Sequence, residues 1–146
     1  MQLTKTLVAA ILAASTASAA PTADEKSMMA AVPQWTFENM ERVCKEDDSC
    51  CTWKFSINTH LADPTNCVYK VEAAVASHAN GGPSKCGGYT ITSGWSGQFG
   101  PGNGFTVLSV VDDEKRLITY PSYTDKQVEG GNVVKPDQSY APAALP

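Results

Sequence analysis

The sequence predicts an all-β fold: a single small antiparallel β-sandwich or β-barrel, stapled by disulfides. Three observations predict it. Several short segments alternate between apolar and polar residues, which is the period-two pattern of half-buried strands. Glycine, proline and asparagine separate these segments at a spacing of about ten residues, as in sandwiches and barrels. The chain has 146 residues and five cysteines, which suits one domain with two disulfides.

The clearest predicted strand covers residues 51–58, because Trp53, Phe55 and Ile57 alternate with polar residues. Further strands are expected over residues 34–43, 67–71, 89–95, 105–111, 117–120 and 132–134. In the first of these, Met40 falls out of phase with the preceding aromatic residues, which indicates a bulge. Residues 105–111 (FTVLSVV) are mainly apolar, so we expect a central strand covered on both faces.

Turn-forming residues mark the breaks between these strands. We expect turns at residues 80–83 (NGGP) and 112–115 (DDEK) and a longer glycine-rich connection at 97–104 (GQFGPGNG). A helix over residues 71–78 is an alternative to strand there. Its alanines favour a helix, but the segment is short and continues a strand pattern.

The first residues have the pattern of a secretory signal peptide. Lys5 provides a positive start, residues 7–14 are apolar, and residues 17–19 (ASA) form a small-x-small cleavage site. A transmembrane anchor would need about 20 apolar residues, far more than this run provides. We therefore expect a signal peptide over residues 1–19, a flexible arm or pro-segment over 20–33, and a single β domain over 34–146. The product is expected to be secreted and extracellular, without a membrane span.

Composition excludes other classes of protein. The net charge is -4 and the lysines and arginines form no cluster, so the chain lacks the basic footprint of a nucleic-acid binder. A hydrophobic fraction of 42% is too high for a disordered chain.

The face of the predicted strand on which a cysteine lies indicates how the five cysteines pair. Cys51 shares the inward face of its strand, so it is suited to bridge Cys44 across a short hairpin, which leaves Cys67 to pair with Cys86. Cys50 then remains as a free or intermolecular thiol. The alternative pairs Cys44 with Cys50 and leaves Cys51 as a buried thiol. A monomer is expected, with a dimer through Cys50 as the alternative. The cysteines lack the paired spacing of a zinc site, so no metal is predicted.

Catalytic motifs are largely missing from the sequence, and no catalytic residue or cofactor is predicted. Residues 94–98 (GWSGQ) resemble a nucleophile elbow but end in glutamine and lie in a β context. His60 and His78 are expected as solvated surface residues, and the acidic residues at 46–48 and 112–113 as turn residues.

Aromatic residues offer the remaining candidate chemistry. Trp95 leads into the glycine-rich connection, and Phe99 and Asn103 lie within it. Aromatic rings on a loop can stack on sugars or anchor a partner protein, so these three residues form the candidate binding surface. The alternative is that Trp95 or Phe99 folds back to cap the core.

Five motifs carry a resemblance to a known family: residues 32–36 (VPQWT), 51–57 (CTWKFSI), 93–106 (SGWSGQFGPGNGFT), 120–127 (YPSYTDKQ) and 134–140 (VKPDQSY). The chain resembles the small secreted, hypersensitive-response-inducing (elicitor) proteins of ascomycete fungi over nearly all of its mature part. The resemblance implies secretion, a compact disulfide-containing β fold and, for some members, elicitation of plant defence. It also implies a single cysteine at the position of Cys51, so Cys50 departs from the family pattern.

Three classes of function follow. The first is a secreted, non-catalytic fungal effector or elicitor that acts through its surface on a plant surface receptor or an apoplastic protein. The second is a module that binds carbohydrate or a cell-wall polysaccharide through Trp95, Phe99 or tyrosines. The third, more remote, is a small secreted hydrolase. The protein is not expected to be an enzyme.

Overall fold

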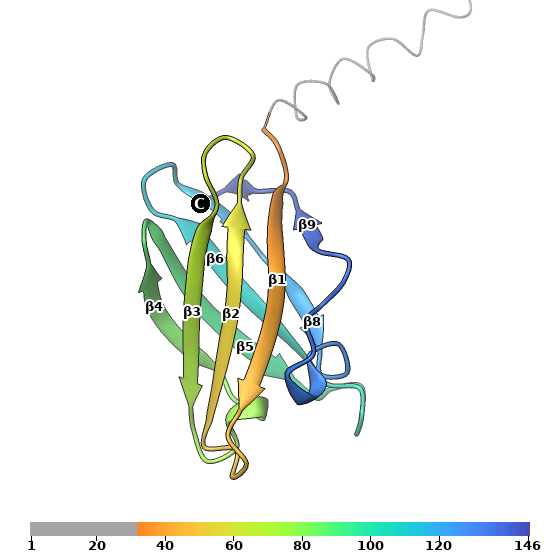
Figure 1. Ribbon diagram of the computed structural model, residues 1–146. Helices are drawn as coiled ribbons and strands as arrows, with labels where there is room; N and C mark the ends of the chain where they lie inside the picture. Colours follow the sequence, from red (N-terminus) through yellow and green to blue (C-terminus); the bar gives the residue numbers. More distant parts are fainter. Residues whose placement is uncertain (1–31) are drawn as a thin grey trace, which may run out of the picture. The chain divides into compact units, whose positions relative to one another are not determined.

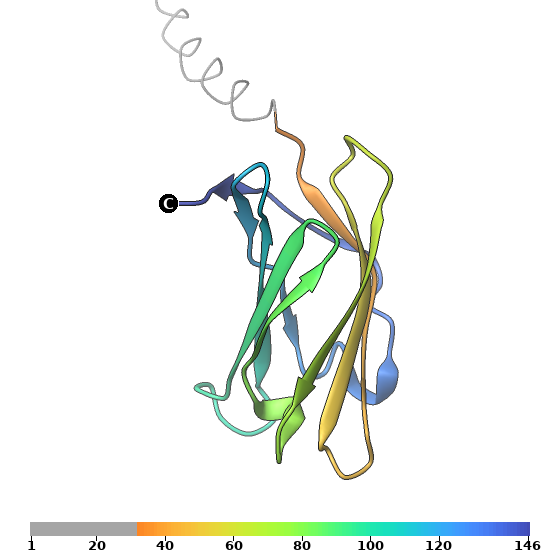
Figure 2. The ribbon, with the colours of Figure 1, turned by 90° about the vertical axis from the view of Figure 1, so that its left-hand side faces the viewer.

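Two antiparallel sheets packed face to face make up the structure, a computed structural model that describes residues 32–146 (Figures 1 and 2). The all-β prediction is therefore confirmed, in the form of a sandwich. The predicted signal peptide, residues 1–19, and nearly all of the predicted arm, residues 20–33, lie outside the described residues. Within the described part, no helix is long and apolar enough to cross a membrane.

The first sheet has four strands in the order β3-β2-β1-β9. Their bounds are Trp35–Cys44 for β1, Cys50–Asn58 for β2, Thr65–Glu72 for β3 and Gln138–Tyr140 for β9. The alternation predicted for residues 51–58 is seen directly in β2, whose odd-numbered residues from Cys51 to Ile57 are buried. Strands β1, β2 and β3 form a meander, and the short strand β9 adds to the free edge of β1 near the end of the chain.

The second sheet has the order β10-β7-β6-β5-β4, with β8 also paired to β6. Its strands are β4 (Gly81–Cys86), β5 (Tyr89–Ser96), β6 (Phe105–Asp112), β7 (Leu117–Thr119), β8 (Ser122–Thr124) and β10 (Ala143–Ala144). Strand β8 pairs with the first half of β6 and β7 with the second half, so the two short strands share one edge of β6. Two 3₁₀ turns, η2 (Ala76–His78) and η3 (Glu129–Gly131), join strands.

The core lies between the two sheets and is rich in aromatic residues. Tyr123 of β8 packs against Trp53 of β2, with ring centroids 6.4 Å apart, so the aromatic contacts run from one sheet to the other. Burial of such large apolar side chains is the main driving force for folding. The buried cluster comprises Trp35, Phe37, Met40, Trp53, Phe55, Ile57, Cys67, Tyr69, Val71, Ile91, Leu108, Val110, Tyr123, Val128 and Val134.

A β-bulge in β1 sets which of its side chains face the core. The register with β2 shifts between Glu38 and Glu41, and Asn39 has a φ of 53°. An extra residue at a bulge reverses the inward and outward alternation that follows it. Met40 and Arg42 are therefore buried, whereas an unbroken strand would have turned both outward. The bulge expected from Met40 is present, and it also turns a charged residue toward the interior.

Each disulfide connects two strands that follow one another in the chain. Cys44 is bonded to Cys51 across the β1–β2 hairpin, and Cys67 is bonded to Cys86. The second bridge joins β3 of the first sheet to β4 of the second, so it closes one side of the sandwich. Cys50 is half-buried and forms no disulfide. The alternative pairing of Cys44 with Cys50 does not occur.

Three expectations about individual elements need correction. Residues 132–134 form no strand, because a single hydrogen bond from Val134 N to Met40 O ties them to β1 and the strand lies further on, at β9. Residues 80–83 are not only a turn, since β4 begins at Gly81 and passes through a register shift before Ser84. The alternative helix over residues 71–78 is also wrong, because β3 continues to Glu72 and only the short 3₁₀ turn η2 follows.

The expectation for β6 was correct in part. It is central in its sheet, paired with β5 on one side and with β7 and β8 on the other. Only one of its faces is buried, however, with Leu108 and Val110 in the core and Val107 and Val111 half-exposed on the other side. In a two-layer sandwich no third layer covers that outer face, which explains the difference.

Candidate functional site

The predicted binding residues lie at the end of the sandwich where β1 and β5 finish (Figure 1). Trp95 is the last residue but one of strand β5, and the glycine-rich segment 97–104 connects β5 to β6. Two successive turns close this segment: Gly100 N donates to Gly97 O and Asn103 N to Gly100 O, at 3.0 and 3.1 Å. Gly100 has a φ of 94°, a conformation that favours glycine. The segment is therefore hydrogen-bonded into a defined shape.

Trp95 is packed into this end of the domain. The His78 ring stacks on it with a centroid separation of 4.0 Å and an interplanar angle of 11°. The backbone of Gly104 comes so close that a Cβ there would lie 2.7 Å from Cζ2 of Trp95. The indole Nε1 donates to Asp125 Oδ2 at 3.0 Å. Since His78 already occupies a face of the ring, Trp95 offers much less stacking surface than its sequence position predicts.

Phe99 and Asn103 are the exposed members of the predicted surface. The Phe99 side chain is 65% exposed and stacks against Phe105 of β6 with centroids 5.9 Å apart. Asn103 is exposed as well, but its Nδ2 donates to the carbonyl of Phe99 at 3.2 Å, so part of its side chain stabilises the segment. The three predicted residues thus lie together but differ in role: Trp95 anchors the segment, Asn103 stabilises it and Phe99 presents an apolar ring to solvent.

Asp125, which follows β8, connects this segment to the first sheet. Its Oδ2 accepts the Trp95 indole and lies 3.8 Å from His78 Nε2, and its Oδ1 accepts Arg42 Nη1 at 3.2 Å. Its backbone N also donates to Gly104 O. The Asp125 carboxylate therefore links β1 of the first sheet to β5 of the second and to η2, and the Asp125 backbone contacts the glycine-rich segment.

Arg42 was not singled out in the sequence, and it is the most unusual polar residue at this end. It is 8% exposed, and its guanidinium lies over the Trp53 ring, 5.5 Å from the centroid. Nη1 donates to Asp125 and, more weakly at 3.5 Å, to the carbonyl of Ser77, while Nε is buried with no hydrogen-bond partner among residues 32–146. The out-of-phase Met40 was the available signal, since the bulge that buries Met40 also buries Arg42.

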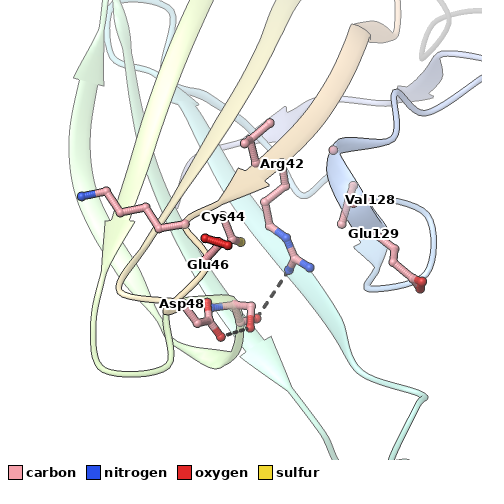
Figure 3. A pocket seen from close by; sticks show the side chains of 11 residues that line it. Arg42, Cys44, Glu46, Asp48, Val128 and Glu129 are labelled. Atoms are coloured by element: carbon pink, nitrogen blue, oxygen red, sulfur yellow. Dashed lines mark hydrogen bonds between the residues drawn. The ribbon is translucent and has the colours of Figure 1, made fainter.

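A cleft of about 500 Å³ opens beside Arg42 (Figure 3). We call it the Arg42 cleft. One wall is the end of β1 with the β1–β2 turn, and the opposite wall is the segment from Val128 through η3. The volume lies within the range of about 300–1,000 Å³ that is typical of small-molecule sites. Figure 3 shows one guanidinium nitrogen of Arg42 bonded to Ser77 and the other directed toward Val128 and Glu129.

A second, smaller hollow of about 370 Å³ lies on the other side of Asp125. It is lined by His78, Trp95, Asp125 and the glycines and proline of the glycine-rich segment. Phe99 is not part of its lining. The Arg42–Asp125 ion pair therefore separates two hollows at the same end of the domain.

The charged turns have structural partners. Both backbone N–H groups of Glu114 and Lys115 donate to Asp112, and the hydrogen bonds from Lys85 and Thr90 lower the pKa of the Asp113 carboxyl. In the β1–β2 turn, hydrogen bonds from the Ser49 hydroxyl and backbone N–H lower the pKa of Asp47. These contacts agree with the expectation that the acidic pairs are turn residues.

One cluster in the described residues has the composition of a metal site. Cys44, Asp48 and Cys51 place their ligand atoms within 4.8 Å of one another. Both sulfurs are joined in the hairpin disulfide, so neither is a thiolate that could bind a metal. Both Asp48 oxygens are also used, by the backbone N–H and the hydroxyl of Ser77.

Comparison with known proteins identifies the family. The family model described as Effector TSP1 matches residues 36–145, which covers both sheets except for Trp35, the first residue of β1. A curated protein named Effector TSP1, from the fungus Hypocrea virens, is 63% identical over 147 aligned positions that cover 100% of both chains. The chain thus belongs to the Effector TSP1 family of fungal proteins.

Proposed function

We propose that the protein is secreted by a fungus and acts on plant tissue as a non-catalytic effector, recognised through the glycine-rich segment 97–104. The proposal rests on two observations: the chain belongs to an effector family, and the ring of Phe99 is exposed on the hydrogen-bonded segment 97–104. Phe99 is the contact residue, and the recognised partner is a plant surface receptor or an apoplastic protein. The plant response is the induction of defence or a hypersensitive reaction.

The geometry of Phe99 supports this role. Aromatic side chains are enriched among the residues that contribute most to protein–protein affinity. Two turns and the Asn103 side chain already order the backbone around Phe99, so binding would cost little conformational entropy. Other exposed apolar side chains of the described residues, such as Leu61 and Tyr120, stand on separate connections.

The non-catalytic and secreted character rests on further support. At this end of the domain Asp125 is held by Arg42 and Trp95, and His78 is stacked on Trp95, so this acid and this base serve structural contacts. Secretion is favoured by the signal-peptide pattern over residues 1–19 and by the two disulfides, which persist in oxidising compartments.

Infiltration of purified mature protein into leaves tests the proposal. The folded protein should induce defence genes or local necrosis, and Phe99→Ser should reduce the response by roughly tenfold, as expected for loss of a contact worth about 1.4 kcal/mol. Leu61→Ser is the matched control, because Leu61 is 62% exposed against 65% for Phe99 and lies in the β2–β3 connection. This control should respond like the parent protein.

Two outcomes would count against the proposal. If the folded parent protein gave no response in several plant hosts, the effector role in plants would be lost. If Phe99→Ser and Leu61→Ser responded alike, recognition would not occur through segment 97–104. A cell-wall binding role is the second candidate, favoured by the outward ring of Phe99. It predicts retention on chitin or glucan that Phe99→Ser abolishes and Leu61→Ser does not.

A further inference from the structure

We propose that the smaller hollow beside Asp125 binds one neutral pyranose residue of a saccharide, through the polar side chains of His78 and Asp125 and an apolar wall that includes Trp95 and Pro101. We call this cavity of about 370 Å³ the His78 hollow. The proposal goes beyond the role of Phe99, which does not line the hollow. Saccharide binding and the leaf response can therefore fail independently of each other.

The first step concerns the polar groups that a ligand can reach. The side chains of His78 and Asp125 both line the hollow and are 49% and 24% exposed. His78 Nε2 lies 3.8 Å from Asp125 Oδ2, which is too far for a hydrogen bond between them. A ligand hydroxyl placed between the two atoms can donate to the carboxylate and accept the N–H of the imidazole. The pair therefore suits a group that both donates and accepts, as a hydroxyl does.

The second step is the charge of the hollow, which selects a neutral ligand. Asp125 is the one acidic residue in the lining, and its other oxygen, Oδ1, accepts Arg42 Nη1 at 3.2 Å. A cationic ligand would compete with Arg42 for the carboxylate, and an anionic ligand would be repelled by it. A neutral hydroxyl avoids both costs. It uses lone-pair capacity that remains on Asp125 Oδ2 beside the hydrogen bond from the Trp95 indole.

The third step is the apolar part of the lining. Apart from His78 and Asp125, the side chains that line the hollow are Trp95 and Pro101, and the remaining wall is glycine backbone. The carbonyls of Gly97 and Gly100 already accept backbone N–H groups within the glycine-rich segment. The ligand therefore needs an apolar face for this wall and hydroxyl groups at its edge for His78 and Asp125. A pyranose ring has this combination, with C–H groups on its faces and hydroxyls around its rim.

The fourth step is the space that the glycines leave. A Cβ added at Gly100 or Gly102 would meet no atom within 4 Å, so no side chain fills the hollow from these positions. The volume lies in the lower part of the range that is typical of small-molecule sites, which suits a single sugar residue. Two turns already order the glycine-rich segment, so this wall is formed before a ligand binds and little entropy is lost.

The tryptophan indole signals in a ¹H–¹⁵N NMR spectrum test the proposal on the intact mature protein. Of the three tryptophans, Trp95 lines the hollow, whereas Trp35 and Trp53 are buried in the core and serve as internal references. The Trp95 indole donates to Asp125 Oδ2, so a ligand hydroxyl on this oxygen should shift its signal. Laminaribiose, N,N′-diacetylchitobiose, glucose, glucuronate, 6-amino-6-deoxyglucose and phenol are titrated at neutral pH and constant ionic strength.

The expected result is a saturable shift of the Trp95 signal with the neutral sugars, with a Kd of about 1 mM for the better disaccharide. The Trp35 and Trp53 signals should not move. Tighter binding of laminaribiose identifies β-glucan as the source of the sugar residue, and tighter binding of diacetylchitobiose identifies chitin. The proposal is overturned if no neutral sugar gives a saturable Trp95 shift up to about 50 mM.

The remaining ligands test the selectivity. Glucuronate and 6-amino-6-deoxyglucose differ from glucose by one charged group, and each should bind at least about threefold more weakly than glucose. Equal binding of either charged sugar would contradict the selection of a neutral ligand. Phenol offers one hydroxyl on an aromatic ring, and binding as tight as that of the better disaccharide would overturn the assignment to a sugar.

Variants locate the ligand within the hollow. His78→Phe keeps a ring beside Trp95 but removes both nitrogens, so the affinity for the better disaccharide should fall about tenfold. His60→Phe is the matched control, because His60 is the other histidine of the chain and lies in the β2–β3 connection. Pro101 is exposed, so Pro101→Ser tests the apolar wall without a change in the core, and it should weaken binding about threefold. Equal affinities of His78→Phe and His60→Phe, or an unchanged affinity of Pro101→Ser, would contradict the assignment to the hollow.

Discussion

Arg42 and Phe99 lie at the same end of the domain and differ in how they meet solvent. Phe99 is an exposed ring on a connection ordered by two turns, and it is seen in the sequence as an aromatic residue among glycines. Arg42 is a buried charge turned inward by the bulge in β1. Asp125 stands between them, because it pairs with Arg42 and accepts the Trp95 indole that anchors the glycine-rich segment.

The comparison separates an exposed aromatic ring from a buried charge. Removal of an exposed side chain changes the free energy of unfolding little. Removal of a buried charge leaves its partner unsatisfied, so Arg42 matters for stability. Changes at the two positions should therefore differ most in how strongly they affect folding.

The largest expected effect is the loss of the buried guanidinium. Arg42→Met should lower the free energy of unfolding by about 3 kcal/mol, at the lower end of the range for breaking a buried ion pair, because the Asp125 side chain is 24% exposed. Phe99→Ser should stay within about 0.5 kcal/mol of the parent protein. Urea denaturation of the mature protein measures both.

The double variant Arg42→Met/Asp125→Asn checks the cause. If the loss comes from an unpaired Asp125, the double variant should be more stable than the sum of the single effects by about 0.5–3 kcal/mol. Strict additivity, or a Phe99→Ser variant as unstable as Arg42→Met, would break the distinction between the two residues.

A smaller effect should separate two glycines of segment 97–104. A Cβ at Gly104 would lie 2.5 Å from Asp125 Oδ2, so Gly104→Ala should cost about 1–3 kcal/mol through overpacking and shift the NMR signal of the Trp95 indole N–H. A Cβ at Gly100 meets open space, so Gly100→Ala should cost about 1–2 kcal/mol through its positive φ alone. An unchanged Trp95 signal in Gly104→Ala would show that Asp125 does not tie the segment to the core.

The sequence alone predicts some of these strands and misses others. Alternation predicts β2 and β3 because their buried faces are apolar at every second position. It fails for β4, where Gly81 permits close packing: a Cβ there would lie 2.8 Å from the Tyr69 hydroxyl and from Val71. A glycine required by packing looks the same in sequence as one required by a turn. Strands β9 and β10 are too short to show any period.

The candidate site also contains one residue that the sequence predicts and one that it does not. Phe99 could be predicted because an aromatic residue in a polar, glycine-rich connection has no strand phase to assign it to the core. Arg42 could not, because its burial depends on the bulge, on Asp125 eighty-three residues away and on the Ser77 carbonyl. Contacts between residues so distant in sequence follow from how the sheets pack, and no local pattern contains them. The out-of-phase Met40 indicates the bulge but not what lies opposite it.

The smallest expected effect concerns pH and distinguishes the β1–β2 turn from the glycine-rich segment. Residues 97–104 contain no ionisable side chain, whereas the β1–β2 turn beside the Arg42 cleft contains Asp47. The Ser49 hydrogen bonds lower the pKa of Asp47 below its ordinary value of 3.8. Because this pKa is lower in the folded than in the unfolded state, the stabilisation is present above about pH 4 and is lost as the pH falls through the folded-state pKa. An NMR titration of the Ser49 amide should show a midpoint below 3.8, and Asp47→Asn should abolish that transition. A midpoint at or above 3.8 would mean that the Ser49 hydrogen bonds do not hold the turn in solution.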